Sequence, residues 1–206
     1  MNIITDAQPS PDDSAPSADA RDRADMEKLQ AGHEAVLNDL MARHATPVFH
    51  FLCRMVGNED DANDLAQETF VRVFKSSKSF RAEQKFSSWL FTIAANLARN
   101  HFRWRTRHPN VSLDAENPET EQSLGSTLPA NSPAPNDAAL ATERAKAVRR
   151  AVNQLPEDLR VAIVLCEWED RSIAEAATIL EATPKAVESR LYRARQILRE
   201  RLKSWL

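Results

Sequence analysis

Residues 183–203 read TPKAVESRLYRARQILRERLK, and this stretch carries the clearest helix signal in the chain. Thr183 is a typical N-cap and Pro184 a typical first helical residue, so a long helix is expected from here to about Lys203. At about 100° per residue, one face of that helix is apolar and the opposite face carries hydrogen-bond donors and one aromatic ring. The apolar face holds Val187, Leu191, Ala194, Leu198 and Leu202. The polar face holds Lys185, Ser189, Tyr192, Arg193, Gln196 and Arg199.

A shorter helix is expected immediately before this one, from an N-cap at Ser172 to about Leu180, with a turn at residues 181–183. A short helix, a three-residue turn and a longer basic helix form a helix-turn-helix, whose second helix enters the major groove of DNA. An ordinary helical hairpin with a charged face is the alternative, because helices joined by short turns are common. Two further helices are expected upstream, over residues 140–154 and from Pro156 onward.

The rest of the chain also favours helices. Only three glycines occur in 206 residues, which leaves no glycine-rich phosphate loop and little material for tight β-hairpins. Apolar stripes at helical spacing predict helices between residues 25 and 57, from about 60 to 75 and from about 86 to 105. Gly57 is expected to end one helix and Asn58 to cap the next. The chain is therefore predicted to be all-α.

Composition divides the chain into four parts. Residues 1–25 are rich in Asp, Ala, Ser and Pro, so they are expected to form a disordered tail. Residues 26–108 and 140–206 carry the helical patterns and are predicted to form two small helical domains. Residues 109–139 hold five prolines and five acidic residues but no Lys or Arg, which indicates a flexible acidic linker between the two domains.

The net charge of −3 hides two basic segments. Residues 84–113 contain five Lys or Arg residues and no acid, with Phe102 and Trp104 among the arginines. Residues 184–206 contain seven basic residues and two acids. A single such segment is usually a solvated helix face, but two of them, one interleaved with aromatic rings, favour binding to nucleic acid. The helix over residues 60–75 has an acidic face, which is either solvated or a docking face for a basic partner helix.

Several other functions find no support in the sequence. Cys53 and Cys166 are far apart and are expected to be reduced, buried side chains. His50 and Cys53 lack a second pair of ligands, whereas structural zinc normally takes four, so no metal site and no cofactor are expected. The amino terminus lacks a secretory signal, and the longest apolar run, residues 161–166, is too short to span a bilayer. No catalytic constellation is present, so the chain is predicted to be a cytoplasmic protein that is not an enzyme.

The motifs resemble a known family. Residues 61–70, DANDLAQETF, and 86–96, FSSWLFTIAAN, are similar to region 2 of bacterial sigma factors. Residues 155–157, LPE, and 186–195, AVESRLYRAR, are similar to their region 4. Two domains without a third between them resemble the extracytoplasmic-function (ECF) group. A stand-alone helix-turn-helix regulator is the alternative, although it would leave the acidic helix and the first basic segment unexplained.

The resemblance implies that the first domain is a region 2 helical bundle with two binding partners, core RNA polymerase and promoter DNA. Sigma factors bind core RNA polymerase, and the matching helix here presents Asp61, Asp64, Gln67 and Glu68. The loop from Phe80 to Lys85 matches the one that captures a base flipped out of the promoter −10 element. The −10 DNA-binding residues implied in this way are Phe80, Arg81, Asn96, Arg99, Arg103, Trp104 and Arg105. Trp89 is expected to pack in the core, whereas Phe102 and Trp104 could each pack or stack on DNA.

The resemblance implies that the last helix of the second domain, the region 4 helix-turn-helix, contacts the promoter −35 element. The residues expected there are Lys185, Glu188, Ser189, Arg190, Tyr192 and Arg193. Arg190, Arg195 and Arg201 lie closer to the apolar face, so phosphate groups or neighbouring helices are their expected partners. The acidic linker matches the segment that threads the polymerase channel. An anti-sigma factor is a further candidate partner.

Overall fold

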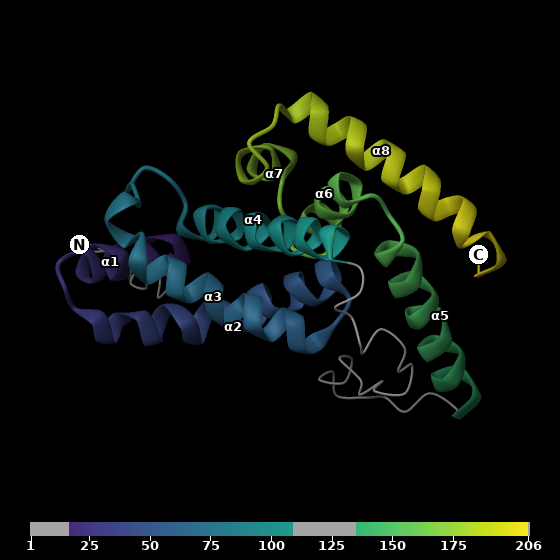
Figure 1. The fold of residues 1–206 in the computed structure, drawn as a ribbon, viewed down its shortest axis with the longest axis horizontal. Coiled ribbons are helices and arrows are strands. Elements are labelled where there is room, and N and C mark those ends of the chain that lie inside the picture. Colours follow the sequence, from purple (N-terminus) through teal and green to yellow (C-terminus); the bar gives the residue numbers. More distant parts are fainter. Residues whose placement is uncertain (1–16, 109–134, 206) are drawn as a thin grey trace, which may run out of the picture.

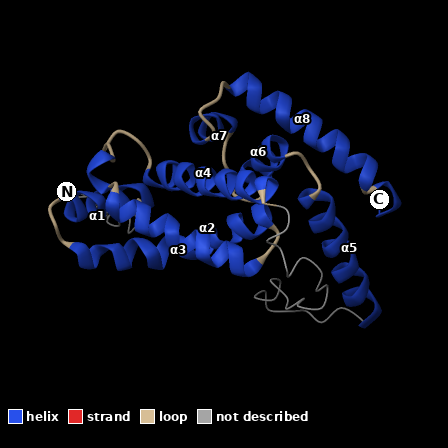
Figure 2. Cartoon of the chain, viewed as in Figure 1, coloured by secondary structure: helices blue, strands red, loops and turns tan. Residues whose placement is uncertain are grey.

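The computed structural model describes residues 17–108 and 135–205, with side chains from residue 142 onward in the second range. The expected tail over residues 1–16 and most of the expected linker, residues 109–134, lie outside the described residues. The described chain consists of helices and loops without strands, which confirms the all-α prediction (Figure 2). The elements are α1 (Ala18–Gln30), η1 (Glu34–Val36), α2 (Leu37–Val56), α3 (Glu59–Lys75), η2 (Ser77–Ser79), α4 (Phe86–Arg107), α5 (Pro135–Asn153), α6 (Glu157–Glu167), α7 (Ile173–Ile179), α8 (Pro184–Arg201) and η4 (Lys203–Trp205).

The amino-terminal bundle, α1 to α4, is organised around a tight junction between α2 and α3. Gly57 ends α2 in the left-handed conformation, with φ of +76°, and its N–H donates to the carbonyl of Cys53. Asn58 then caps α3 by accepting from the N–H of Asp61 at 2.9 Å. Both caps were predicted. The junction returns α3 along α2, and α4 covers the pair.

The boundary of the amino-terminal tail needs correction, because residues 18–25 form the first turns of α1. Asp22 and Asp25 are buried, and both accept hydrogen bonds from Arg43 on α2, at 2.9 and 2.6 Å. His44 Nε2 lies 2.8 Å from the second carboxylate oxygen of Asp22. The acidic composition therefore reflects ion pairing with α2 rather than disorder over these residues.

The carboxyl-terminal bundle, α5 to α8, contains the predicted helix-turn-helix in α7 and α8. Ser172 and Glu175 form a reciprocal capping box at the start of α7. Thr183 caps α8 by accepting from the N–H of Ala186 at 3.2 Å, and Pro184 stands in the first turn. Three apolar residues of α8 are buried against α6 and α7, as the helical periodicity predicts: Val187, Leu191 and Ala194.

The two bundles pack on one another and share a continuous hydrophobic core. Every residue of α6 from Leu159 to Leu165 is buried, because this helix lies between α8 on one side and α2 and α4 on the other (Figure 1). In addition, α7 packs against α4. Both predicted helical domains are present, and their described parts pack on one another as one body.

Candidate partner and nucleic-acid interfaces

The acidic face of α3 is only partly free. Asp64 and Gln67 are exposed, and Glu68 accepts a hydrogen bond from Arg72 at 2.8 Å, which lowers its pKa. Asp61, which the sequence groups with them, is turned toward α4, where its carboxylate lies 3.3 Å from His101 and 3.6 Å from Arg105. The acceptors on the outer surface of α3 are therefore Asp64, Gln67 and Glu68, and Glu68 among them is already paired with Arg72.

The same surface of α3 continues into exposed apolar side chains. Val71 is 41% exposed and Phe74 is 39% exposed. A surface of acceptors bordered by apolar groups can contact both a basic and an apolar partner surface.

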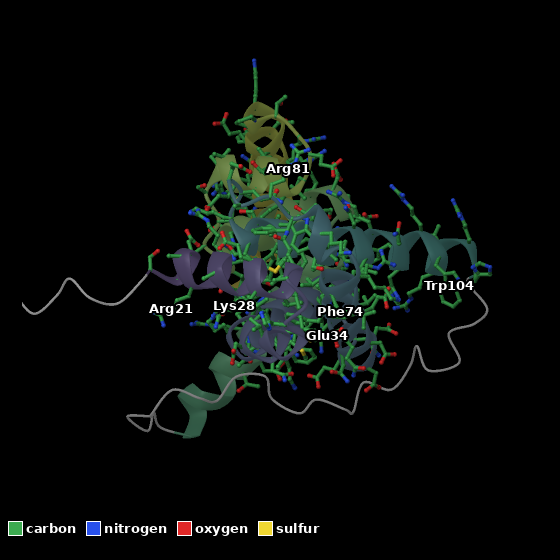
Figure 3. All side chains as sticks on the ribbon, turned by 90° about the vertical axis from the view of Figure 1, so that its left-hand side faces the viewer. Arg21, Lys28, Glu34, Phe74, Arg81 and Trp104 are labelled. Carbon is green, nitrogen blue, oxygen red and sulfur yellow. The ribbon has the colours of Figure 1, made fainter. Side chains whose placement is uncertain are left out.

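The loop between η2 and α4 corrects one predicted role. The ring of Phe80 is 6% exposed and packs against Phe86 and Trp89, with ring centroids 6.1 and 5.3 Å away. Phe80 therefore anchors the loop and does not present its ring to DNA. Arg81, the next residue, is exposed (Figure 3). Trp89 is half-buried and packs against the core, in line with its predicted packing role.

The carboxyl end of α4 separates Phe102 from Trp104. The ring of Phe102 lies beneath the guanidinium of Arg160, 4.9 Å from its centroid, and so packs within the protein. Trp104 is 49% exposed and stacks on His108 at 5.1 Å. Arg103 and Arg105 beside it are exposed, although Arg105 also lies near Asp61. Figure 3 shows Trp104 well away from Arg81.

The middle of α4 is covered by the carboxyl-terminal bundle. Asn96 accepts from Arg99 at 3.1 Å, and Arg99 in turn lies 3.9 Å from Glu157 on α6. Burial lowers the pKa of Arg99 and raises the pKa of Glu157. The attraction between the two charges acts in the opposite direction on each pKa but is the smaller effect. Arg99 is therefore not free for DNA in this arrangement, contrary to its predicted role.

The outward face of α8 is open. Tyr192 is 66% exposed, and the other exposed residues of the predicted set are Lys185, Glu188, Ser189 and Arg193. Arg190 is directed toward α6, with its Nε 4.0 Å from Asp158. Arg195 pairs with Glu167, and Arg201 donates to the carbonyl of Ala151 at 3.1 Å. All three arginines therefore have partners on neighbouring helices, one of the two kinds of partner expected for them from the sequence. We accordingly remove Arg190 from the residues expected to contact DNA.

Comparison with known proteins identifies the family of the chain. Residues 40–108 match the Sigma-70 region 2 family, and residues 145–198 match the Sigma-70, region 4 family. The RNA polymerase sigma-H factor of Pseudomonas aeruginosa is 31% identical over 90% of this chain and 96% of its own length. The ECF RNA polymerase sigma-E factor of Haemophilus influenzae is 34% identical over 88% of this chain and 95% of its own. The chain belongs to the ECF group of RNA polymerase sigma factors.

Solved structures agree with this assignment. CnrH, in its complex with the cytosolic domain of CnrY, superposes on this sigma factor with a TM-score of 0.65 at 26% identity, over 89% of this chain and 98% of CnrH. The sigma factor RpoE of Bartonella quintana, in complex with the anti-sigma factor NepR, gives a TM-score of 0.61 at 25% identity, over 81% and 96% of the two chains.

A cavity of about 290 Å³ lies between α2, α5 and Trp168 of this sigma factor, lined by His50 and Cys53 among others. Burial raises the pKa of Cys53 to about 11, so the thiol is protonated at neutral pH. Residues 17–108 and 142–205, whose side chains the structure describes, contain no group of three side chains able to hold a metal ion. Over these same ranges, no helix has the length and apolar character needed to cross a membrane.

Sequence reasoning missed the side chains that join distant elements. Arg160 of α6 donates to the carbonyl of Met55 on α2, and Gln30 of α1 donates to carbonyls of η2 and its flank. The acceptors in both cases are backbone carbonyls, which every residue type has. No motif or charge pattern in the sequence could therefore have indicated these contacts.

Proposed function

We propose that this sigma factor binds core RNA polymerase in the cytoplasm and directs it to promoters through two separate DNA-contacting surfaces. The observation that carries the proposal is the open outer face of α8, which presents donors and an aromatic ring while its other face is buried. Sigma factors are not a class of enzyme, and we assign this chain recognition rather than catalysis. Because the RpoE structure is a complex with an anti-sigma factor, we include a partner of that class.

The polymerase-docking surface is assigned to Asp64, Gln67 and Glu68 of α3, with Asp61 at its edge. Exposed acceptors on one helix face suit a basic helix of the partner, and opposite charges across an interface speed association and fix orientation. Reversing the charge of Asp64 and Glu68 together should weaken the affinity for core polymerase about tenfold or more.

Asp39, an exposed acid on α2, offers a matched control, and its reversal should leave the affinity unchanged. Binding of labelled full-length chain to core polymerase measures the difference, with far-UV circular dichroism to verify the fold. Equal affinities for the wild type and the doubly reversed variant would remove this surface from docking.

The −10 surface is assigned to the two ends of α4. Arg81 precedes its first turn, and Arg103, Trp104 and Arg105 stand near its last. Phe86 and Trp104 are separated by about 27 Å at 1.5 Å per helical residue. That span corresponds to about eight nucleotides of a B-form strand at 3.4 Å each. One helix is thus long enough to contact both ends of a short promoter element.

Trp104 offers an aromatic face for stacking on an unpaired base, since base–aromatic stacking tolerates any base. Trp104→Ala should therefore slow the formation of open complexes on duplex promoters and affect pre-melted promoters far less. The proposal predicts no effect for Phe102→Leu beyond a loss of stability, because that ring is packed beneath Arg160. Equal losses on the two templates for Trp104→Ala would argue against a role in melting.

The −35 surface is assigned to Lys185, Glu188, Ser189, Tyr192 and Arg193 of α8. Arg193 is the candidate for a bidentate contact to guanine, a contact that contributes about 1–3 kcal/mol of discrimination. Arg193→Ala should relax the preference at one position, whereas Arg199→Ala should weaken binding to all sequences alike and flatten the salt dependence. Holoenzyme binding to a set of −35 variants tests this, and a uniform loss for Arg193→Ala would exclude direct base contact.

A further inference from the structure

We propose that Gln30 of α1 is a positioning residue for promoter melting: it holds the loop between η2 and α4, residues 80–85, in the geometry needed at the −10 element. The proposal rests on the function proposed above. It extends the −10 module to α1, which lies outside the part of the chain that matches Sigma-70 region 2, residues 40–108.

The contact itself is bidentate. Gln30 is the last residue of α1, and its Nε2 donates to the carbonyl of Ser77 at 2.9 Å and to that of Phe80 at 3.0 Å. A primary amide has two N–H donors, and here both are directed at backbone oxygens. Since Ser77 begins η2 and Phe80 follows its end, one side chain fixes this short helix at both ends.

Phe80 is also held through its side chain. The ring of Phe80 is buried against Phe86 and Trp89, while its carbonyl is held by Gln30. The path of the chain is therefore fixed at the point where the exposed residues, beginning with Arg81, depart from the bundle. A turn follows, closed by the N–H of Gln84 donating to the carbonyl of Arg81 at 3.1 Å.

Helix α1 also reaches the far end of the loop. Asp19, near its start, lies 3.8 Å from Lys85, the residue before α4. Lys85 makes its closer contact, 2.9 Å, with Glu175 of α7, so Asp19 is the weaker partner. Arg43 and His44 of α2 fix α1 itself through the buried Asp22 and Asp25. A helix that is anchored in this way and touches both ends of the loop can hold it rigid.

A rigid loop matters because flipping a base out of the duplex requires unstacking, which contacts in the protein must offset. A loop that has to become ordered at that step loses conformational entropy, whereas one already held in place does not. Loss of the two hydrogen bonds of Gln30 should consequently affect melting of the duplex more than binding of DNA that is already open.

The experiment compares Gln30→Met, which keeps the length of the side chain and removes both donors, with the wild type in full-length holoenzyme. The templates are a promoter selected by wild-type holoenzyme from random DNA and the same promoter with a pre-melted −10 bubble. We expect open complexes to form about tenfold more slowly on the duplex and within twofold of wild type on the bubble. Glu27→Ala, an exposed change on α1, is the control and should match the wild type on both.

A second measurement tests the order of the loop directly. Trypsin should cut the isolated full chain after Lys78 and Arg81 faster in Gln30→Met than in the wild type, with little change elsewhere. Gln30→Glu, which places acceptors against the two carbonyls, should behave in the same way and replaces Gln30→Met if that variant does not fold. The positioning role would be overturned if Gln30→Met changed the rate of open-complex formation by the same factor on the duplex and on the bubble template. Unchanged cleavage of the loop by trypsin would overturn it as well. Failure of the wild-type holoenzyme to select or open any promoter would instead refute the proposed function, and the positioning role with it.

Discussion

Arg160→Met is expected to lower the free energy of unfolding by about 2–4 kcal/mol. The Arg160 side chain on α6 is buried, and its guanidinium donates to the carbonyl oxygens of Met55 at 2.6 Å, of Leu155 at 3.0 Å and of Asn153. Met55 stands in the last turn of α2 and Asn153 ends α5. Carbonyls at helix ends lack partners within the helix and carry the negative end of its dipole, so one cation serves two helices.

The magnitude follows from two opposing terms. Hydrogen bonds to a charged group contribute about 1.5–3 kcal/mol each, so the three bonds together give about 4.5–9 kcal/mol. Taking the guanidinium out of water costs several kcal/mol, and burial does lower the pKa of Arg160. Its position over the Phe102 ring, at 4.9 Å, adds a smaller favourable contribution. Methionine avoids the desolvation cost but leaves the carbonyls without a donor.

Urea denaturation followed by circular dichroism measures the loss, and tryptophan fluorescence provides a second probe. Arg160→Lys keeps the charge but has no planar fork, so it should recover only part of the stability. Arg150→Met, a matched change at an exposed position of α5, should stay within about 0.5 kcal/mol of wild type. A change of less than about 0.5 kcal/mol for Arg160→Met would refute the reasoning, because it would mean that water satisfies the carbonyls equally well.

Three further predictions concern local geometry and charge. Gly57→Ala should lower the free energy of unfolding by about 1–2 kcal/mol, because φ is +76° and a Cβ would lie 2.8 Å from the side-chain nitrogen of Asn153. An unchanged urea midpoint would contradict this. Glu181→Gly should raise that free energy by up to about 1 kcal/mol, since Glu181 adopts a φ of +51°, and a lower midpoint would count against it. The hydrogen bond from Lys85, followed by those from Ser172, lowers the pKa of Glu175 from 4.5 to about 2. This contribution to stability is complete above pH 4.5 and is lost as the pH falls toward 2, so Glu175→Gln should make stability less dependent on pH between these values, as acid titration would reveal.

Most helices and several of their ends could be predicted because their signals are local, although α1 begins inside the predicted tail and α5 begins inside the predicted linker. The cap at Asn58, the capping residue Ser172 and the start of α8 at Thr183 each depend on a hydrogen bond to a residue three positions away. The buried face of α8 follows from its 3.6-residue period alone. The outward direction of Tyr192 follows from the same angular argument, whereas that argument left the partner of Arg190 open between phosphate groups and a neighbouring helix.

The contacts between the bundles could not be predicted in this way. Arg54 donates to Glu169 across 115 positions, and Arg171 donates to Ser87 across 84. Nothing in the pattern around either arginine distinguishes it from one on a solvated face. Likewise, the aromatic residue Phe80 in a polar segment is consistent with capture of a base, and only the nearby rings of Phe86 and Trp89 show that it is packed.

The packing of the bundles bears directly on how DNA could reach α4. Glu157 and Glu175 of the carboxyl-terminal bundle lie against Arg99 and Lys85, so both cations already have a carboxylate partner in this arrangement. The pair of Arg99 with Glu157 is weak, since burial opposes the charge of both groups, and Lys85 is exposed enough for salt to screen its pair. A DNA strand brings many phosphates to the same place and releases counterions as it binds. Contact between Arg99 and DNA consequently requires α6 to move away from α4, whereas the free groups at the two ends of the helix, Arg81 and Trp104, need no such movement. The first contacts with the −10 element are therefore expected at the ends of α4 rather than at its middle.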